Sequence, residues 1–411
     1  MGKPRLLILG TGFGAMALLR RINRQAYDVT VVSPRNHFVF TPLLPSSTVG
    51  TIEFRSLIEP VRARRPGIQF HLGRAVHLDL AAKTVHCQCV VSDVAWQQPY
   101  DILVLAVGCV TNSFGVPGVE QHAHFLKEIE DARRIRQSLV ANLERASLPG
   151  VSPEEQARLL HFVAVGGGPT GVRFAGELHD LLRTDLPRSY PQLVGKPRVT
   201  ILDSSSSVLS SYDQALREYT QKVFASRGVI IRTATRVEGV TEQGINLPHG
   251  EKLPCGMVLW SAGFARNPLI AGLDVEKDPS GRIFTEENLQ LPGYPGVYSV
   301  GDCTRPRSKD LPQLAQVAEQ QGRYLAANLN AVAQGKTVSP FVWKPWAVSS
   351  FLGGGAAVSE GGDSGSKLSG FWAYQQWRAA TWTQLVSLRS KLLVPADRLR
   401  AFVFGREISR L

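Results

Sequence analysis

The sequence predicts an α/β protein with two Rossmann-like dinucleotide-binding domains and a C-terminal amphipathic helical segment. The two domains are predicted from two glycine-rich loops, one near residue 10 and the other near residue 166. Each loop follows a short apolar strand, as in dinucleotide-binding domains. Residues 371–411 predict the helical segment, because they are rich in aromatic and basic side chains. A chain of 411 residues, 44% hydrophobic and 19% charged, is long enough for two or three domains and too apolar to be disordered.

The first glycine-rich loop lies between a strand predicted at Arg5–Leu9 and a helix predicted from Met16 to about Asn23. Gly10 allows a tight turn, Gly12 lets backbone amides approach a pyrophosphate, and the small Ala15 lets the helix pack on the strand. The free N–H groups and the dipole of the helix N-terminus favour an anion there. The residues expected to bind this dinucleotide are Gly10, Gly12, Phe13, Gly14 and Ala15.

The next predicted strand, Asp28–Ser33, ends without the acidic residue that usually binds a ribose at this place. Ser33, Pro34 and Arg35 stand there instead. We expect the ribose contact to come from Ser33, and Arg35 to reach an adenine or a phosphate.

The second glycine-rich loop follows a strand predicted at His161–Val165 and begins a helix predicted at Pro169–Leu182. The next strand, Arg198–Leu202, ends in Asp203, which is suited to hydrogen-bond a ribose 2′-OH. A carboxylate would repel a 2′-phosphate, so the sequence favours NADH over NADPH. The residues expected to bind this second dinucleotide are Gly166, Gly168, Thr170, Gly171 and Asp203.

A third motif, Gly301-Asp302, directly follows a strand predicted at Val297–Val300. In flavoproteins with two dinucleotides such a pair binds the ribityl and phosphate part of the flavin, whereas the alternative for Asp302 is a helix N-cap or a turn. Two further apolar strands, at 102–108 and 258–263, end in glycine-containing turns where the chain would pass between domains. These turns add Ala106, Gly108 and Gly263 to the expected cofactor-binding residues.

The formal net charge of +12 indicates an anionic partner, which could be nucleic acid, a lipid surface or a phosphate-bearing cofactor. Nucleic acid is disfavoured, because the basic residues form no helix–turn–helix, finger or RNA-binding motif. The five cysteines, an odd number without regular spacing, suit a reducing compartment, and no metal site is predicted. No run of about 18 apolar residues is present, so a membrane-spanning helix is not expected.

Longer motifs along nearly the whole chain identify a family. They are Gly10–Ala15, Val32–Asn36, Phe40–Pro45, Gly50–Thr51, Ala106–Gly108, Phe114–Gly118, His124–Glu128, Gly166–Val172, Val300–Asp302, Ala315–Ala318 with Gln320, and Phe404–Arg410. In these residues the chain resembles the type II (alternative, non-electrogenic) NADH:quinone oxidoreductases, and it looks closest to fungal and other eukaryotic members.

The resemblance implies FAD in the first domain, NADH in the second, and transfer of two electrons to a membrane quinone without proton pumping. It implies domain boundaries at 1–125 and 269–335 for FAD, 126–268 for NADH and 336–411 for the C-terminal segment. In the family the position next to the flavin corresponds to Thr41 and Pro42, and the quinone side to Ala315, Gln316 and Gln320. The alternative for the two glutamines, which share a helix face, is a solvated surface.

Two departures from the family pattern leave other functions open. Arg173 stands where the family has glutamate, so a cation in the first helical turn opposes the dipole and reverses the local charge. We expect Arg173 to change the electron acceptor or the proton path, unless its side chain simply extends to solvent. Gln313-Leu314 replaces a Pro-Thr pair. The alternatives are an FAD oxidoreductase of specialised metabolism acting on a quinone-like compound outside the respiratory chain, and a low-turnover FAD-binding redox-sensing or assembly protein.

The C-terminal part is expected to attach the protein to a membrane surface. Gly353–Gly355 and Glu360–Gly370 indicate a flexible linker, and Pro395 is expected to separate two helical pieces. From Phe371 onward the sequence has seven Lys and Arg and two acidic residues, which gives a net charge of +5, together with several Trp and Tyr. The alternative is a helix pair for core packing or for a homodimer.

The resemblance implies a peripheral protein of the mitochondrial inner membrane. Only a few residues precede the apolar run of the first strand, which leaves no room for a signal or transit peptide in this sequence. Either the protein is not targeted in that way, or the given sequence lacks the presequence, so a cytosolic location stays an alternative.

Overall fold

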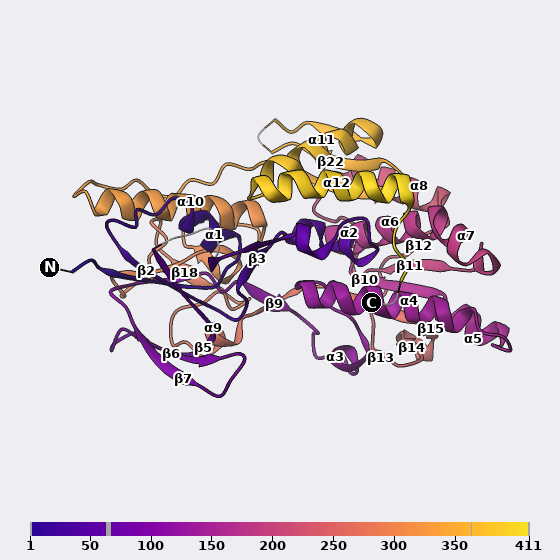
Figure 1. Cartoon of the computed structure of the whole chain (residues 1–411), viewed down its shortest axis with the longest axis horizontal. Helices are drawn as coiled ribbons and strands as arrows, with labels where there is room; N and C mark the ends of the chain where they lie inside the picture. The colour runs from indigo at the N-terminus through magenta and orange to yellow at the C-terminus, as the bar shows by residue number, and fades with distance from the viewer. Residues whose placement is uncertain (1, 63–66, 363, 410–411) are drawn as a thin grey trace. The chain divides into compact units, whose positions relative to one another are not determined.

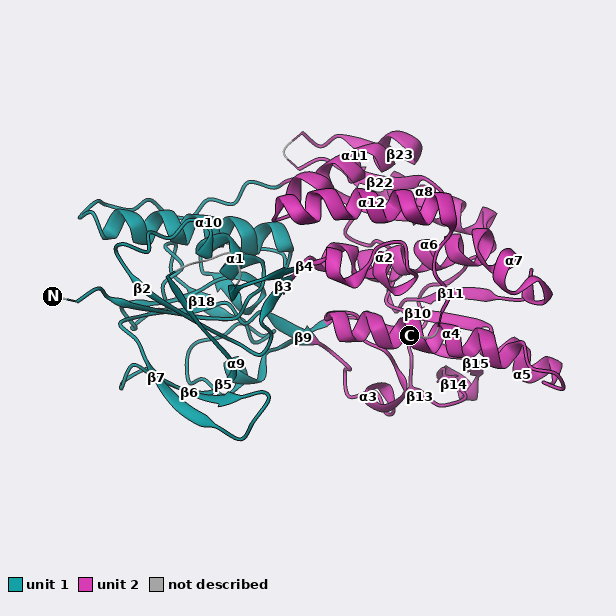
Figure 2. Cartoon of the chain, viewed as in Figure 1, with its two compact units in different colours: residues 1–38, 59–110, 264–345 teal, residues 39–58, 111–263, 346–411 magenta. Residues whose placement is uncertain are grey.

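The structure, a computed structural model, describes residues 2–62, 67–362 and 364–409. The chain forms two compact units (Figure 2). Unit 1 comprises Met1–Phe38, Glu59–Val110 and Phe264–Pro345, and unit 2 comprises Val39–Ile58, Thr111–Gly263 and Trp346–Leu411. This division differs from the predicted boundaries, because 39–58 and the C-terminal segment from Trp346 onward join the unit that holds the second glycine-rich loop, whereas 336–345 stays with unit 1.

Unit 1 is built on a seven-stranded sheet in the order β19-β8-β1-β2-β5-β6-β7. Figure 1 labels β2, β5, β6 and β7 among these strands. The first five strands pair in parallel and the last two antiparallel. The strand β1, in the middle of the five parallel strands, is buried along Leu6–Leu9, as expected where both faces of a sheet are covered. The strands span Arg5–Leu9 (β1), Asp28–Ser33 (β2), Ile68–Asp79 (β5), Thr84–Cys89 (β6), Ala95–Pro99 (β7), Ile102–Leu105 (β8) and Val297–Ser299 (β19).

Two helices of unit 1, α1 (Phe13–Leu19) and α10 (Ala315–Val332), pack closely on each other. Their backbones approach so closely at Gly14 and Gly322 that a Cβ on Gly322 would lie 2.1 Å from the Gly14 carbonyl oxygen. The helix predicted from Met16 to about Asn23 begins at Phe13 and ends at Leu19. The smaller elements are α9 (Pro268–Ala271), η6 (Gly301–Cys303), the parallel pair β18 (Ile283–Thr285) and β20 (Thr304–Pro306), and the pair β9 (Cys109–Thr111) and β17 (Phe264–Arg266).

Unit 2 has a parallel sheet of four strands in the order β12-β11-β10-β16. The strands span His161–Val165 (β10), Arg198–Leu202 (β11), Ile230–Arg232 (β12) and Met257–Trp260 (β16), and the main helices span Ile129–Ala146 (α4), Pro169–Thr184 (α6) and Gln214–Ser226 (α8). An antiparallel sheet follows, made of Gly239–Thr241 (β13), Gly244–Asn246 (β14) and Lys252–Pro254 (β15).

Short helices and turns complete the chain. In unit 2 they are η1 (Thr41–Leu43), α2 (Leu44–Thr48), η2 (Phe54–Ser56), α3 (Val119–His122), α5 (Pro153–Leu159), α7 (Leu186–Ser189), η4 (Pro191–Leu193) and η5 (Pro248–Gly250). The strands β3 (His37–Val39) and β4 (Ile58–Pro60) form a two-stranded sheet.

The prediction of a flexible C-terminal linker is wrong, because Gly353–Gly355 lie at the turn of a β-hairpin. The strands β21 (Val348–Gly353) and β22 (Ala356–Glu360) pair antiparallel, and β23 (Lys367–Ser369) extends the sheet. Gly354 and Gly355 supply the positive φ that the turn needs. Gly176 of α6 lets this hairpin approach, since a Cβ there would lie 2.6 Å from the Leu352 carbonyl carbon. The hairpin therefore joins the core of unit 2.

Pro395 does not separate two helical pieces, as the sequence predicted. It lies inside α12 (Leu388–Phe404), which follows α11 (Gly370–Gln384). A proline leaves the carbonyl four residues earlier without its helical donor, here Lys391. The indole N–H of Trp382 in α11 donates to that carbonyl at 3.0 Å, so the neighbouring helix supplies the missing hydrogen bond.

Within the described ranges, no helix has the length and apolar character to cross a lipid bilayer.

Candidate functional site

The first glycine-rich loop turns sharply between β1 and α1. Gly10 has φ +107°, and a Cβ there would lie 2.4 Å from the Ala106 carbonyl oxygen. Gly12 is the N-cap of α1, and a Cβ on it would meet nothing within 4 Å. Gly14 packs on Val300, whose side chain a Cβ would approach to 2.9 Å. The loop is therefore closed on its protein side and open at the helix N-terminus, where a pyrophosphate fits.

Phe13 and Ala15, at the start of α1, pack into unit 1 next to the loop. The Phe13 ring packs edge-on against Phe38 at 4.9 Å between centroids, and Ala15 is fully buried. Ala15 thus has the packing role that the sequence predicted.

The end of β2 differs from the expectation that Ser33 faces a ribose. Ser33 is buried, its hydroxyl lies 3.1 Å from the Thr11 hydroxyl, and it accepts from the Arg35 backbone N–H at 3.3 Å. Arg35 also donates from Nε to Thr11 at 3.3 Å, whereas Pro34 is exposed. Thr11, which sequence reasoning missed, therefore ties the loop to the strand end, and Arg35 is the partly exposed polar side chain there.

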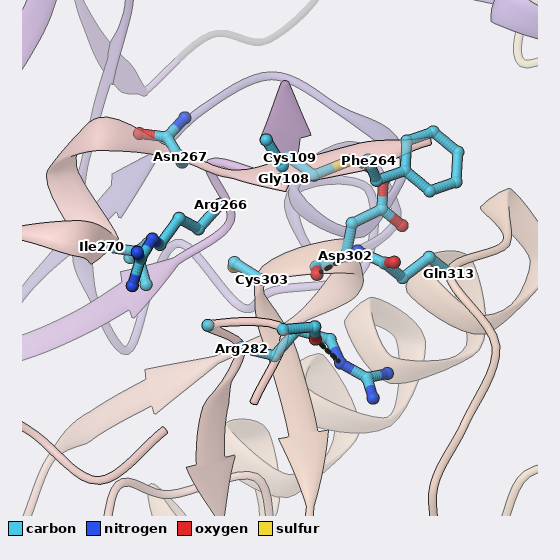
Figure 3. A pocket seen from close by; sticks show the side chains of 13 residues that line it. Gly108, Cys109, Phe264, Arg266, Asn267, Ile270, Arg282, Asp302, Cys303 and Gln313 are labelled. Carbon is cyan, nitrogen blue, oxygen red and sulfur yellow. Dashed lines mark hydrogen bonds between the residues drawn. The ribbon is translucent and has the colours of Figure 1, made fainter. Parts of the chain in front are cut away.

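Asp302 lies in the 3-10 turn η6 at the end of β19, within a pocket of unit 1 (Figure 3). The N-cap of this turn is Val300, so the alternative of a helix N-cap for Asp302 is wrong. The Cys109 thiol donates to the Asp302 carboxylate at 3.2 Å, and Gln313 Nε2 donates to the Asp302 carbonyl at 2.9 Å. Gln313 thus fixes the backbone of the Gly-Asp motif from the position where the family pattern has proline.

The neighbours of Asp302 leave room for a ligand. A Cβ on Gly108, with φ +65°, would meet nothing within 4 Å, and Ala106 before it is buried. Gly301, with φ +81°, donates its N–H to Gln321 Oε1 at 2.6 Å. Gln321, five residues beyond Gln316, is buried, and sequence reasoning missed it. These features fit the flavin that the Gly-Asp motif predicts.

Helix α10 begins at Ala315 and places Gln316 and Gln320 one turn apart. Gln320 is not a freely solvated residue: its Nε2 donates to the Lys344 carbonyl at 2.8 Å and its Oε1 accepts from the Lys344 N–H at 3.1 Å. Gln316 is partly buried. Gln320 therefore anchors the chain after α10, and its role toward a quinone stays a prediction.

The second glycine-rich loop repeats the geometry of the first within unit 2. Gly166 has φ +104°, and its Cβ would lie 2.9 Å from the Ala262 N atom. Gly168 is the N-cap of α6, and a Cβ there would meet nothing within 4 Å, beside the partly buried Thr170. Gly171 packs so tightly that a Cβ would lie 2.0 Å from the Gly166 carbonyl oxygen. The open N-terminus of α6 again fits a pyrophosphate.

Asp203 stands directly beside this loop. Its Oδ2 accepts from the Gly167 N–H at 2.5 Å and its Oδ1 from the Ser205 N–H at 2.6 Å. A carboxylate has about four acceptor positions, so ribose hydroxyls still find acceptors there. Gly263 has φ +68°, and a Cβ there would lie 2.3 Å from the Phe114 ring. Ser261 Oγ donates to the Gly166 carbonyl at 3.1 Å. Sequence reasoning missed Ser261.

Arg173 is the fifth residue of α6, just after its first turn, and the alternative that its side chain extends to solvent is wrong. It donates from Nη1 to the Pro42 carbonyl at 3.2 Å and from Nη2 to the Ser349 carbonyl, and its Nε is buried without a partner. No carboxylate forms an ion pair with it in the described part of the chain, and Tyr212 is the ionisable side chain that acts on its charge. Burial lowers the pKa of Arg173, and burial also raises the pKa of the nearby Tyr212 to about 12, although the Arg173 charge opposes that rise.

Thr41 and Pro42 form the 3-10 turn η1 before α2, and both are partly buried. The structure thus brings Pro42 and Arg173 together within unit 2.

Comparisons with known proteins agree with this arrangement. The model of the pyridine nucleotide-disulphide oxidoreductase family matches residues 4–322. A Dictyostelium discoideum protein named probable NADH dehydrogenase is 41% identical over 98% of this chain and 91% of its own length. An Arabidopsis thaliana protein named internal alternative NAD(P)H-ubiquinone oxidoreductase A1, mitochondrial, is 38% identical over 100% of this chain and 86% of its own.

Solved structures show the same fold. The structure of NDH2 from Plasmodium falciparum in complex with NADH superposes with a TM-score of 0.94 at 23% identity, covering 99% of this chain and 100% of that one. The sulfide:quinone oxidoreductase of Aquifex aeolicus gives a TM-score of 0.75 at 19% identity, covering 99% of this chain and 96% of that one.

Proposed function

Because the chain belongs to the type II (alternative) NADH:quinone oxidoreductases of the pyridine nucleotide-disulphide oxidoreductase family, we propose that it oxidises NADH and reduces a membrane quinone. The observation that carries this proposal is the pair of glycine-rich loops, each tightly packed at its first and last glycines and open at the glycine that caps the helix N-terminus. No proton pumping accompanies the reaction.

FAD supplies the redox chemistry when bound, accepting hydride from NADH and passing two electrons on. The chain's own residues bind and orient. In unit 1 the loop at Gly12, the opening at Gly108 and the motif at Asp302 hold the flavin dinucleotide. In unit 2 the N-terminus of α6 at Gly168 holds the NADH pyrophosphate, and Asp203 accepts from the ribose hydroxyls. The carboxylate favours NADH over NADPH by charge.

The acceptor side comprises Thr41, Pro42, Ala315, Gln316 and Gln320 in this proposal. Arg173 belongs with them, because its guanidinium holds the Pro42 carbonyl. A buried cation in this place favours an acceptor that gains negative charge as it is reduced. Arg173 therefore influences which quinone the protein uses.

Helices α11 and α12 attach the protein to a membrane surface in this proposal. Trp372, Leu388, Leu392, Phe402 and Phe404 are all more than half exposed on these two helices. Such a concentration of exposed apolar side chains beside basic residues is typical of helices that lie in the lipid interface. In contrast, Trp377 stacks on Phe351 at 5.0 Å and is buried. Part of the segment therefore packs in the core, as the alternative interpretation expected, while the rest faces outward; Arg410 lies outside the described residues.

One experiment tests the proposed reaction. NADH oxidation by the purified, FAD-loaded protein is measured with and without a short-chain ubiquinone. Fast turnover that depends on the quinone is expected. Slow turnover with a single unusual acceptor would favour the specialised oxidoreductase, and bound FAD without turnover would favour a redox-sensing or assembly protein.

Sedimentation with anionic liposomes tests the attachment. Replacing Trp372, Phe402 and Phe404 by serine is expected to release the protein from the liposomes. Val91→Ser with Val94→Ser, two exposed valines of unit 1, is the matched control and should leave binding unchanged. Equal binding of both variants would contradict attachment through α11 and α12. It would also remove the support that this attachment gives to a location at the mitochondrial inner membrane.

A further inference from the structure

Helix α6 carries a buried carboxylate that none of the roles above uses. Glu177, 2% exposed, lies one turn after Arg173. Its Oε1 accepts from the Ser46 hydroxyl at 2.6 Å and its Oε2 from the Thr51 hydroxyl at 2.8 Å. Hydrogen bonds to an ionised acceptor are roughly twice as strong as neutral ones. This carboxylate therefore fixes α2 and the loop after it to α6.

The same chain of hydrogen bonds continues into the C-terminal tail. Arg406 donates from Nε to the Thr51 hydroxyl at 2.9 Å, and its Nη1 pairs with Asp185 at 2.7 Å. The Arg406 backbone N–H also donates to Asp185, again at 2.7 Å. Both side chains of this ion pair are shielded, with 13% and 6% of their surface exposed. The tail is thus held inside unit 2, and through Thr51 it holds the segment that α6 also holds.

Other side chains fix the two ends of α2. Arg173 holds the Pro42 carbonyl before the helix, and Arg136 donates from Nε and Nη2 to the Ser47 carbonyl near its end, at 3.1 and 2.6 Å. A helix of five residues is too short to be stable by itself. The position of Thr41 and Pro42 therefore depends on the side chains that hold α2 and its flanks.

We propose that Glu177 and Arg406 are positioning residues for the acceptor side, because they hold α2 and thereby the Thr41–Pro42 turn in place. This inference rests on the proposed function, which assigns that turn to the quinone side. Neither residue needs to touch a reacting atom. Their loss therefore weakens quinone binding and leaves the reaction with NADH intact.

The test compares the two halves of the reaction in the full-length, FAD-loaded protein. Glu177→Gln removes the charge that both hydroxyls contact, Arg406→Met removes the tail contact, and Arg406→Lys keeps the charge but not the fork of donors. We expect the KM for a short-chain ubiquinone to rise about threefold to tenfold in Glu177→Gln and Arg406→Met, and less in Arg406→Lys. The anaerobic rate of flavin reduction by NADH should stay within about twofold of the wild type.

A matched control and a double variant sharpen the result. Arg232→Met breaks an ion pair with Glu251, of 2.7 Å, on the surface of unit 2 and should change neither quantity. Because Glu177 and Arg406 act through the same hydroxyl, their double variant should show less than the sum of the two single effects.

Three outcomes would overturn the inference. One is an unchanged quinone KM in Glu177→Gln and in both Arg406 variants, and another is an equal loss of both half-reactions. A wild type whose flavin is reduced by NADH but which reduces no quinone would overturn the proposed function and this inference with it. The wild-type measurement therefore separates the two failures.

Discussion

The two glycine-rich loops share a backbone path, but the strands beside them end in different chemistry. Gly10 and Gly166 have nearly the same φ, +107° and +104°, and in both loops the N-cap glycine faces open space. At the strand ends, Asp203 presents a carboxylate to its loop, whereas the buried Ser33 is tied to Thr11. In the proposed sites the loop thus sets where a pyrophosphate binds, and the strand end sets which charge meets the ribose.

The largest expected effect concerns the first loop, where Gly10 is tightly packed and Gly12 faces open space. Gly10→Ala should abolish FAD incorporation and destabilise unit 1 by about 3 kcal/mol, because it combines a positive φ with a clash against Ala106. Gly12→Ala should lose FAD without unfolding, since its Cβ only fills the open space. Flavin absorbance per protein and thermal unfolding measure both. Equal stability of the two variants would contradict this division of roles.

A smaller effect concerns the carboxylate at the second strand end. Asp203→Asn should lower kcat/KM for NADH relative to NADPH by about tenfold, because it removes the charge that repels a 2′-phosphate. Steady-state kinetics with both nucleotides measure the ratio. Ser33→Asn is the comparison at the other loop and should leave it unchanged. A constant ratio in Asp203→Asn would show that Asp203 only braces Gly167.

The strands that precede the two loops, β1 and β10, begin with different titratable side chains. The stability of the two units should therefore depend differently on pH. In β10, His161 is buried, with Nδ1 2.8 Å from the Pro254 carbonyl and Nε2 2.8 Å from the Thr200 hydroxyl. Burial lowers the pKa of His161, so the unfolded chain binds the proton more tightly. Stability is then full above the unfolded pKa of about 6.5 and is lost as the pH falls below it. Thermal unfolding between pH 7.5 and 5.5 should show a loss that His161→Gln reduces.

The smallest effect lies at the start of β1. A hydrogen bond from Arg5 lowers the pKa of Asp101 to about 2, so the pair stabilises unit 1 above the unfolded pKa of about 3.9 and this is lost as the pH falls toward 2. Both side chains are nearly half exposed, so screening keeps the contribution small. Asp101→Asn should lower the Tm by about 1 °C at pH 7. A larger shift at pH 3 than at pH 7 would contradict this assignment.

The sequence predicted the strands that carry both loops, because β1, β2, β10 and β11 are short apolar runs whose limits the structure reproduces. It did not predict the C-terminal hairpin, because three consecutive glycines read as a flexible linker until Gly176 and the packing of β21 on α6 are known. Local sequence carries no information on such a distant contact.

The candidate site was predictable to the same extent. Glycines with a fixed backbone role were identified from their spacing, whereas side chains that act through long-range hydrogen bonds were not. Ser33 was expected at a ribose but is buried, because its partner Thr11 lies 22 residues earlier in the chain. Glu177 gave no signal, since its partners Ser46 and Thr51 are more than 100 residues away.

Because its indole N–H is bonded to the Lys391 carbonyl, Trp382 can serve as an intrinsic fluorescent probe of the helix pair. This indole is 48% exposed and Trp372 is 73% exposed, whereas Trp377 is almost completely covered. An indole moved from water into lipid emits at shorter wavelength, so in the proposed attachment Trp382 and Trp372 would report docking, while Trp377 and the four tryptophans outside these two helices supply the background emission. Since the Trp382 N–H is already satisfied within the helix pair, its ring can enter an apolar layer without exposing an unpaired donor. Emission spectra during liposome titration therefore need no added label.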